Sequence, residues 1–173
     1  MTHITLRALE PEDIDLIYRW ENDESVWESS DTYAPFSRHQ LTQYILSAQG
    51  SDIYACRQLR LVGMDGAHAV GCVDLFDFDP RNRRAGMGIL VDRACRGRGY
   101  GEAMVSALHA YCRTHLQLHQ LYCDVASDNA ACIGMLGRCG YHMVGTRKDW
   151  QLCDGRWKDA LSMQCLLNSP AQP

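Results

Sequence analysis

The 173-residue sequence lacks the features that mark membrane and secreted proteins. It contains no apolar run near the roughly 18 residues that a membrane-spanning helix needs. Its first residues, MTHITLRALEPED, do not have the basic and then apolar layout of a secretory signal. These absences predict a soluble cytoplasmic protein that has no membrane partner.

A paired-cysteine metal motif is also missing. No CxxC occurs among the nine cysteines, and even the two nearest, Cys132 and Cys139, are too far apart to form one. His115 and His119 have the i, i+4 spacing of ligands on a helix, but the residues from Leu118 onward are typical of the entry to a strand. We therefore expect no metal, and we expect most cysteines to be small buried side chains in a reducing compartment.

Charge is unevenly distributed along the chain. The net charge of −4 does not favour a nucleic-acid partner. Residues 10–31 hold nine acidic side chains against the single base Arg19, whereas six arginines fall between positions 81 and 98. This pattern suggests two ligand sites of opposite sign, and solvated surfaces are the alternative interpretation.

The order of apolar patterns and turns predicts one α/β (α+β) domain over residues 1–168, followed by a C-terminal tail at residues 169–173. Residues 59–64, 69–78 and 85–91 are expected to form an antiparallel meander. Further strands are expected at residues 4–8, 121–126, 141–146 and 160–167, and helices near residues 11–21, 37–47, 102–116 and 129–139.

Three glycines alternate with other residues where a strand gives way to a helix, in Arg96-Gly97-Arg98-Gly99-Tyr100-Gly101. The segment lacks the Gly-Lys-[Ser/Thr] ending of a P-loop, and Glu102 stands where a dinucleotide fingerprint needs its third glycine. It does fit the pattern [QR]-x-x-G-x-[GA]. Glycines at these positions let backbone N–H groups at a helix N-terminus approach a pyrophosphate, and Arg96 or Arg98 adds positive charge.

Three stretches resemble the GNAT superfamily of acyl-CoA-dependent N-acyltransferases. RRAGMGILV followed by the glycine loop is similar to the family's central strand and pyrophosphate loop. Residues 129–141 are similar to its motif N-x-x-[AS]-x-x-x-[YL]-x-x-x-G-[FY]. The opening LRALEPEDIDLIYRW resembles the branch that contains ribosomal-protein N-terminal and spermidine N-acetyltransferases. The resemblance covers nearly the whole chain.

The resemblance implies a strongly twisted, mostly antiparallel sheet of about seven strands, flanked by helices and splayed after the central strand. It also implies that acetyl-CoA enters this gap as the acyl donor. The backbone of Ile89, Leu90 and Val91 would pair with the pantetheine arm, which Asn129 would also hydrogen-bond. The pyrophosphate would lie in a cradle of Arg96, Gly97, Arg98, Gly99, Tyr100, Gly101 and Glu102, and the helix that ends at Arg138 would flank the thioester.

Direct attack of an amine on the thioester needs a base, a donor for the carbonyl and an acid for the leaving thiolate. Many family members carry a tyrosine as the acid at the position of Leu136. The candidate acids are therefore Cys132, one helical turn earlier, and Tyr141, with water as a third choice; a packing role is the alternative for both residues. Asp77 is the candidate base. On a regular strand Asp74 and Asp77 would face opposite sides, so only one can point into the cleft.

The predicted activity is acetyl transfer to a primary amine: a protein N-terminus, a polyamine or another cationic small molecule. Gly86 stands where spermidine enzymes carry a glutamate, which argues against a polyamine, whereas the acidic residues 10–31 favour a cationic acceptor. Aromatic side chains could wall its pocket or belong to the core (Trp20, Trp27, Tyr33 and Phe36). A non-catalytic acyl-CoA sensor, a longer acyl chain and a homo-oligomer are open alternatives.

Overall fold

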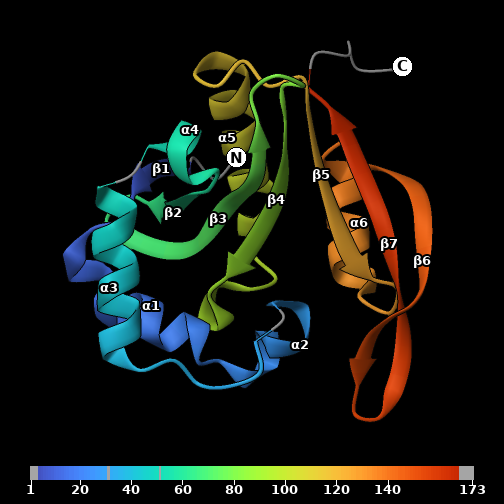
Figure 1. Ribbon diagram of the computed structural model, residues 1–173, viewed down its shortest axis with the longest axis horizontal. Helices are drawn as coiled ribbons and strands as arrows, with labels where there is room; N and C mark the ends of the chain where they lie inside the picture. Colours follow the sequence, from blue (N-terminus) through green and yellow to red (C-terminus); the bar gives the residue numbers. More distant parts are fainter. Residues whose placement is uncertain (1–3, 31, 51, 168–173) are drawn as a thin grey trace.

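The computed structural model describes residues 4–30, 32–50 and 52–167, so the tail expected at 169–173 lies outside the described residues. Seven strands form one sheet in the order β1-β2-β3-β4-β5-β7-β6, with helices on both faces (Figure 1). The strands are β1 (Thr5–Ala8), β2 (Leu59–Asp65), β3 (His68–Asp79), β4 (Arg84–Val91), β5 (Gln120–Ala126), β6 (His142–Cys153) and β7 (Arg156–Leu166). The α-helices are α1 (Ile14–Glu21), α2 (Trp27–Ser30), α3 (Arg38–Gln49), α4 (Ile53–Cys56), α5 (Tyr100–Thr114) and α6 (Ala130–Arg138).

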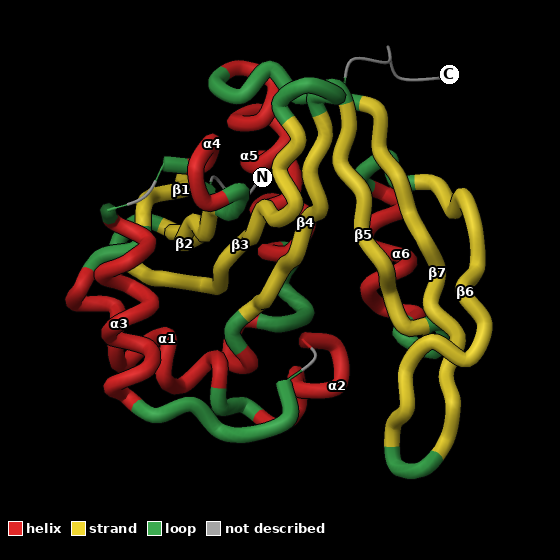
Figure 2. The backbone as a smooth tube through the Cα atoms, viewed as in Figure 1, coloured by secondary structure: helices red, strands yellow, loops and turns green. Residues whose placement is uncertain are grey.

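The sheet opens between its two central strands. β4 and β5 are the parallel pair, and their pairing is confined to Arg84–Gly86 and Gln120–Tyr122. Beyond these residues the two strands diverge, whereas β3 follows β4 as far as Val91 and β7 follows β5 as far as Ala126 (Figure 2). The expected fold, a mostly antiparallel sheet of seven strands splayed after the central strand, is therefore confirmed.

Most elements begin where local sequence signals put them. Ser37 caps α3 in a reciprocal capping box with Gln40, and Pro11 opens the short 3-10 turn Pro11–Asp13 before α1. The predicted extents of the last two strands were wrong: β6 and β7 run to either side of the turn at Asp154-Gly155. Residues 142–150 of β6 are all exposed, so no alternation of apolar and polar residues marked the strand.

Two apolar cores lie on opposite faces of the sheet. The larger one packs α5 and α6 against β3, β4, β5 and β7, and it includes Val73, Leu108 and Leu136. The smaller one packs α1 and α3 against the other face, where Ile17 and Cys72 are buried. Because successive strand residues point to opposite faces, the neighbours Cys72 and Val73 belong to different cores.

All nine cysteines lie in the described residues and are free thiols; four are buried, four half-buried and one, Cys56, exposed. Within residues 4–30, 32–50 and 52–167, no group of three or more His, Cys, Asp or Glu side chains is arranged to hold a metal ion. No helix of the described chain has the length and apolar character needed to cross a membrane.

Candidate functional site

The edge of β4 that faces the opening carries backbone groups at alternate residues, and one of them, the Val91 carbonyl, accepts from Arg96 Nε at 3.2 Å. The Asp92 N–H donates to the Val70 carbonyl at 2.9 Å, which continues the antiparallel β3–β4 ladder. In such a ladder the backbone N–H and C=O groups of every second residue bond the neighbouring strand. Those of Leu90 therefore point toward β3, and those of Ile89 and Val91 point toward the opening. An extended ligand placed there can pair with Ile89 and Val91 as an added strand.

The glycine loop presents backbone donors at the start of α5. Gly97 and Gly99 have φ of 75° and 80°, in the left-handed region that glycine adopts most easily. Gly99 is the N-cap of α5, so the N–H groups of Tyr100, Gly101 and Glu102 have no acceptor within the helix. Among the described residues, no atom lies within 4 Å of the place where a β-carbon at Gly97 or Gly99 would stand. The loop therefore has the geometry that an anion site at a helix N-terminus requires.

Side chains of the loop fasten it to its surroundings. Arg96 lies 3.6 Å from Asp23 and donates to the Val91 carbonyl at 3.2 Å. The Tyr100 hydroxyl donates to Asp65 at 2.7 Å, away from the helix N-terminus. Arg98 is exposed. The geometry thus assigns Arg96 and Tyr100 to holding the loop in place, whereas Arg98 is an exposed cation beside them.

Helix α6 closes over the start of α5. Arg138 pairs with Glu102 at 2.6 Å, and a β-carbon at Gly101 would stand 3.5 Å from Met135 Sδ. Asn129 is the N-cap of α6, and its Oδ1 accepts from the Cys132 N–H at 3.1 Å. The predicted cofactor residues on α5 and α6 are therefore brought together around the loop.

The two candidate acids differ in surroundings. Cys132 is half-buried at the edge of the larger core, and burial raises the pKa of its thiol, which keeps it protonated at neutral pH. Tyr141 is 2% exposed, and its hydroxyl lies 3.3 Å from His109 Nε2 beneath α5. Burial raises the pKa of Tyr141. Leu136 is fully buried in the same core.

Asp77 lies in an irregular part of β3. The register with β4 shifts between Phe76 and Asp79, and Asp77 has φ of 48°. The simple alternation expected for Asp74 and Asp77 therefore does not hold across this bulge. The Asp77 side chain is exposed. The pKa of Tyr122 on β5 is raised, mainly by the burial of Tyr122 and next by the negative charge of Asp77. Asp77 thus lies near the point where β4 and β5 part.

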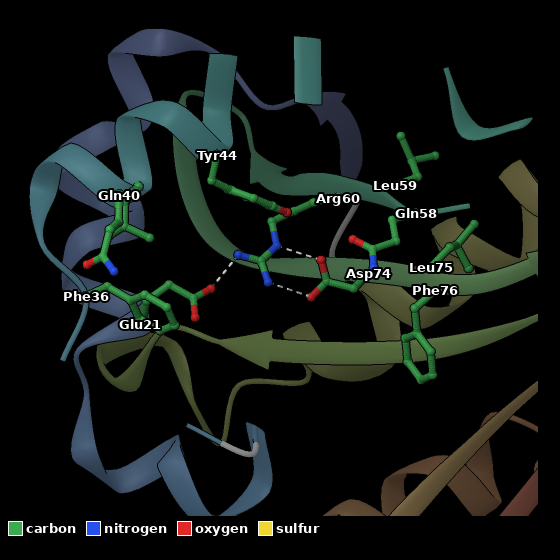
Figure 3. A pocket seen from close by; sticks show the side chains of 11 residues that line it. Glu21, Phe36, Gln40, Tyr44, Gln58, Leu59, Arg60, Asp74, Leu75 and Phe76 are labelled. Atoms are coloured by element: carbon green, nitrogen blue, oxygen red, sulfur yellow. Dashed lines mark hydrogen bonds and ion pairs between the residues drawn. The ribbon is translucent and has the colours of Figure 1, made fainter. Parts of the chain in front are cut away.

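A pocket of about 420 Å³ lies on the α1–α3 face of the sheet (Figure 3). Its centre is Arg60, whose Nε donates to Asp74 Oδ1 at 2.6 Å and whose Nη1 contacts Glu21. The Arg60 guanidinium also lies 5.4 Å from the centre of the Tyr44 ring. The pocket is lined by Glu21, Phe36, Gln40, Leu41, Tyr44, Gln58, Leu59, Arg60, Asp74, Leu75 and Phe76.

The charges of this pocket are unequal. Burial by itself lowers the pKa of Arg60, but the charge and hydrogen bonds of Asp74 raise it well above its ordinary value, so the guanidinium stays protonated. Two carboxyl groups, of Glu21 and Asp74, face this single cation. An acidic group in excess is therefore built into a half-enclosed site.

The sequence alone did not indicate this pocket. Glu21 belongs to the acidic stretch 10–31, but Arg60 and Asp74 come from two other segments and match no motif. Of the aromatic candidates, Phe36 lines the pocket, whereas Trp20 is buried and donates to Asp92 at 2.8 Å. Trp27 and Tyr33 line a separate hollow of about 580 Å³ beside Trp150.

A sheet opened between parallel strands, with a strand edge that leads to a glycine-rich helix N-terminus, is the arrangement expected of an acyl-CoA-dependent acyltransferase. A model of the acetyltransferase (GNAT) domain matches residues 3–142. The chain therefore belongs to the GNAT family, as its motifs indicated, and it is an N-acetyltransferase that acts on amines. The family uses acetyl-CoA.

Individual relatives agree with this assignment. The chain is 26% identical over 164 residues to the ribosomal protein uS5-alanine N-acetyltransferase of Escherichia coli, which covers 83% of this chain and 84% of that protein. The crystal structure of spermidine N-acetyltransferase from Vibrio cholerae with CoA and spermine superposes with a TM-score of 0.87 at 24% identity, covering 96% and 97% of the two chains. A dodecameric structure of the spermidine enzyme from the same organism gives 0.81 at 24%, covering 96% and 95%.

Proposed function

We propose that this chain transfers the acetyl group of acetyl-CoA to a primary amine that carries positive charge, and that the amine binds in the Arg60 pocket. The observation that carries the proposal is the acidic excess of Glu21 and Asp74 in a pocket that reaches Phe76. Phe76 pairs in register with Gly86, the last β4 residue before the strands part. The pocket and the opening therefore meet, as donor and acceptor sites must.

The donor side uses backbone groups. Ile89 and Val91 would pair with the pantetheine arm, and the N–H groups of the loop and of Tyr100 to Glu102 would bind the pyrophosphate. Arg98 would add charge, while Arg96 and the Arg138–Glu102 pair hold the surrounding elements. The Asn129 side-chain amide has an N–H left for the pantetheine, since its Oδ1 caps α6.

In the reaction, the amine nitrogen attacks the thioester carbonyl carbon, a C–N bond forms, and the C–S bond breaks to release a thiolate. The nitrogen must lose a proton first, and Asp77 is the proposed base because it is exposed beside the parting strands. Asp74 attracts the ammonium but has both oxygens bonded to Arg60. We propose the Cys132 thiol as acid for the thiolate, with water as the alternative; nothing in its buried surroundings supports Tyr141.

Release of free thiol from acetyl-CoA tests the proposal, over a panel of diamines, amino acids and N-terminal peptides. We expect turnover with at least one acceptor that bears a second positive charge, and turnover only with uncharged amines would contradict the acidic pocket. Cys132→Ala should lose kcat while its acetyl-CoA affinity, measured by calorimetry, stays unchanged. Cys139→Ala, which removes another half-buried thiol of the α6 region, should keep kcat. Equal kcat for Cys132→Ala and wild type would assign the proton to water.

We further propose that the chain assembles with copies of itself through the β6–β7 hairpin. β6 is an edge strand, and its hairpin exposes large apolar side chains: Met143, Val144, Trp150, Leu152 and Trp157. The dodecameric Vibrio cholerae relative supports a second copy as the occupant. Light scattering should give a multiple of 19.5 kDa for wild type and a smaller particle for Val144→Glu. A wild-type monomer would exclude the assembly.

The free cysteines are consistent with a cytoplasmic location, which we also propose.

A further inference from the structure

The Phe76 ring lies over Gly86 on the pocket face of the sheet, and the Tyr122 ring lies beside it. Gly86 pairs with Phe76 on β3 and with Tyr122 on β5. Side chains of paired strand residues project to the same face, and the Phe76 ring extends from β3 across β4 (Figure 3). Phe76 Cε2 lies 2.1 Å from the place where a β-carbon of Gly86 would stand, and the Phe76 and Tyr122 rings meet edge to face at 6.3 Å.

This ring pair stands where the acyl group of a bound thioester would end. The anion site at Gly97 and Gly99 follows the far end of β4, so a pantetheine arm paired with β4 would run from Val91 toward Gly86. That distance is about 16 Å of extended strand. The acyl carbons beyond the sulfur would then point at the closed end of the opening, where β4 and β5 pair with each other.

A longer acyl chain has one direction left at this point. In the plane of the sheet, the pairing of Gly86 with Tyr122 closes the opening. On the α5 face, Ala85, Met87 and Leu121 belong to the closely packed larger core and are at most 3% exposed. The remaining direction is the face of the Arg60 pocket, and there the Phe76 ring covers Gly86.

We infer that Phe76, held by Tyr122, is the residue that limits the transferred group to a short acyl chain. The inference rests on the acyl-CoA site proposed above. A side chain at position 86 would compete with the ring for the same space, so Gly86 is the partner that lets Phe76 lie flat across β4. The bulge that follows Phe76 lets β3 leave the ladder immediately beyond the ring.

Equilibrium binding of acetyl-CoA, propionyl-CoA and butyryl-CoA tests this role without an acceptor. Wild type should bind these donors with an affinity that falls as the chain lengthens. In Phe76→Ala the vacated space should accept the extra methylenes, each worth about fourfold in affinity. The ratio of butyryl-CoA to acetyl-CoA affinity should therefore rise by up to about 15-fold.

Three further variants make the result specific. Phe76→Leu, which keeps an apolar side chain, should shift the ratio less than alanine does. Gly88→Ala lies on the same face of β4, where its β-carbon would stand 3.5 Å from Asp74 Cβ, and should leave the ratio unchanged. Gly86→Ala should lower stability in wild type, because it displaces the ring, but not in a Phe76→Ala background. This last comparison reports the ring position even if one single variant folds poorly.

The inference is overturned if folded Phe76→Ala or Phe76→Leu keeps the wild-type ratio of butyryl-CoA to acetyl-CoA affinity. It is also overturned if wild type binds butyryl-CoA and acetyl-CoA with equal affinity. A normal affinity for acetyl-CoA in that experiment would leave the proposed activity intact. If wild type binds none of the three thioesters, the proposed cofactor site itself is wrong, and the inference is overturned with it.

Discussion

The two faces of the sheet differ in the polarity of the side chains that pack on them. On the α5 face the core is apolar, and its buried polar pair is His109 with Tyr141. On the α1–α3 face the apolar core is smaller, and charged side chains lie beside it: the half-buried pair Arg60 and Asp74, and the buried Asp92, which accepts from Trp20 and from the exposed Arg19.

This difference separates the work of the two faces. The apolar face fixes where β4 and α5 lie, so that backbone N–H groups can bind a cofactor common to the whole family. The charged face surrounds the pocket in which we propose that the acceptor binds. Changes on one face should therefore alter donor binding or folding, and changes on the other should alter acceptor recognition.

The largest effect is expected at the loop that begins α5. Gly99→Val should abolish measurable acetyl-CoA binding, because φ of 80° is unfavourable for valine and its side chain would cover the N–H groups. Isothermal titration calorimetry measures the affinity. Gly66→Ala is the matched control, since Gly66 has φ of 58° in the β2–β3 turn and lies outside the anion site. Equal affinity in folded Gly99→Val would refute the loop assignment.

A second prediction concerns the buried histidine of the apolar face. Burial, and then the charge of Arg113, lowers the pKa of His109 to about 4 from its ordinary 6.5. The unfolded chain therefore binds a proton between these values that the folded chain does not. Stability should fall as pH falls through this window, by up to about 3 kcal/mol.

Urea unfolding at pH 7, 5.5 and 4.5 measures this loss, and His109→Gln should lose less over the same range. Asp92, on the other face, is protonated at a lower pH. Burial alone would raise the pKa of Asp92, but hydrogen bonds from Trp20, Ala94 and Arg19 lower it below 3.8. The stability that ionised Asp92 contributes is present above pH 3.8 and is lost as the pH falls below this value. Parallel curves for wild type and His109→Gln above pH 4.5 would exclude His109 as the cause.

On the charged face, Asp74→Asn should raise the KM for a cationic amine about tenfold, or roughly 1.4 kcal/mol, because the pocket loses one of its two carboxylates. The acetyl-CoA affinity should not change. Asp79→Asn is the control: Asp79 is on the same strand and 3.4 Å from Arg84, but outside the pocket. An altered acetyl-CoA affinity with an unchanged KM for the amine would reverse the division between the faces.

The smallest effect is expected for Gly88→Ala. The added β-carbon would make ordinary contact with Asp74, so the free energy of unfolding should stay within about 0.5 kcal/mol of wild type. Urea unfolding checks this value. A much larger loss of stability would mean that the pocket has no room for an added β-carbon at Gly88.

Local signals were enough for much of the fold. The proline turn before α1, the Ser37 capping box and the hairpin at Asp65-Gly66 are chain segments of a few residues, and they lie at the bounds expected for the helices near residues 11–21 and 37–47 and between the strands expected at residues 59–64 and 69–78. The exposed residues of β6 carry no such pattern, so its length was missed. The bulge at Asp77 was missed as well, since a register shift depends on the neighbouring strand.

The sequence by itself determined the family of this protein and predicted the residues of its cofactor side. Glycines at 97, 99 and 101 and the β4 strand before them act through their own backbone, which is contiguous in the chain. Only the tertiary structure revealed the charged pocket that we propose as the acceptor site. Glu21, Arg60 and Asp74 come from α1, β2 and β3. Folding brings both carboxylates into contact with Arg60 in a half-buried site, where water screens their charges less than at the open surface.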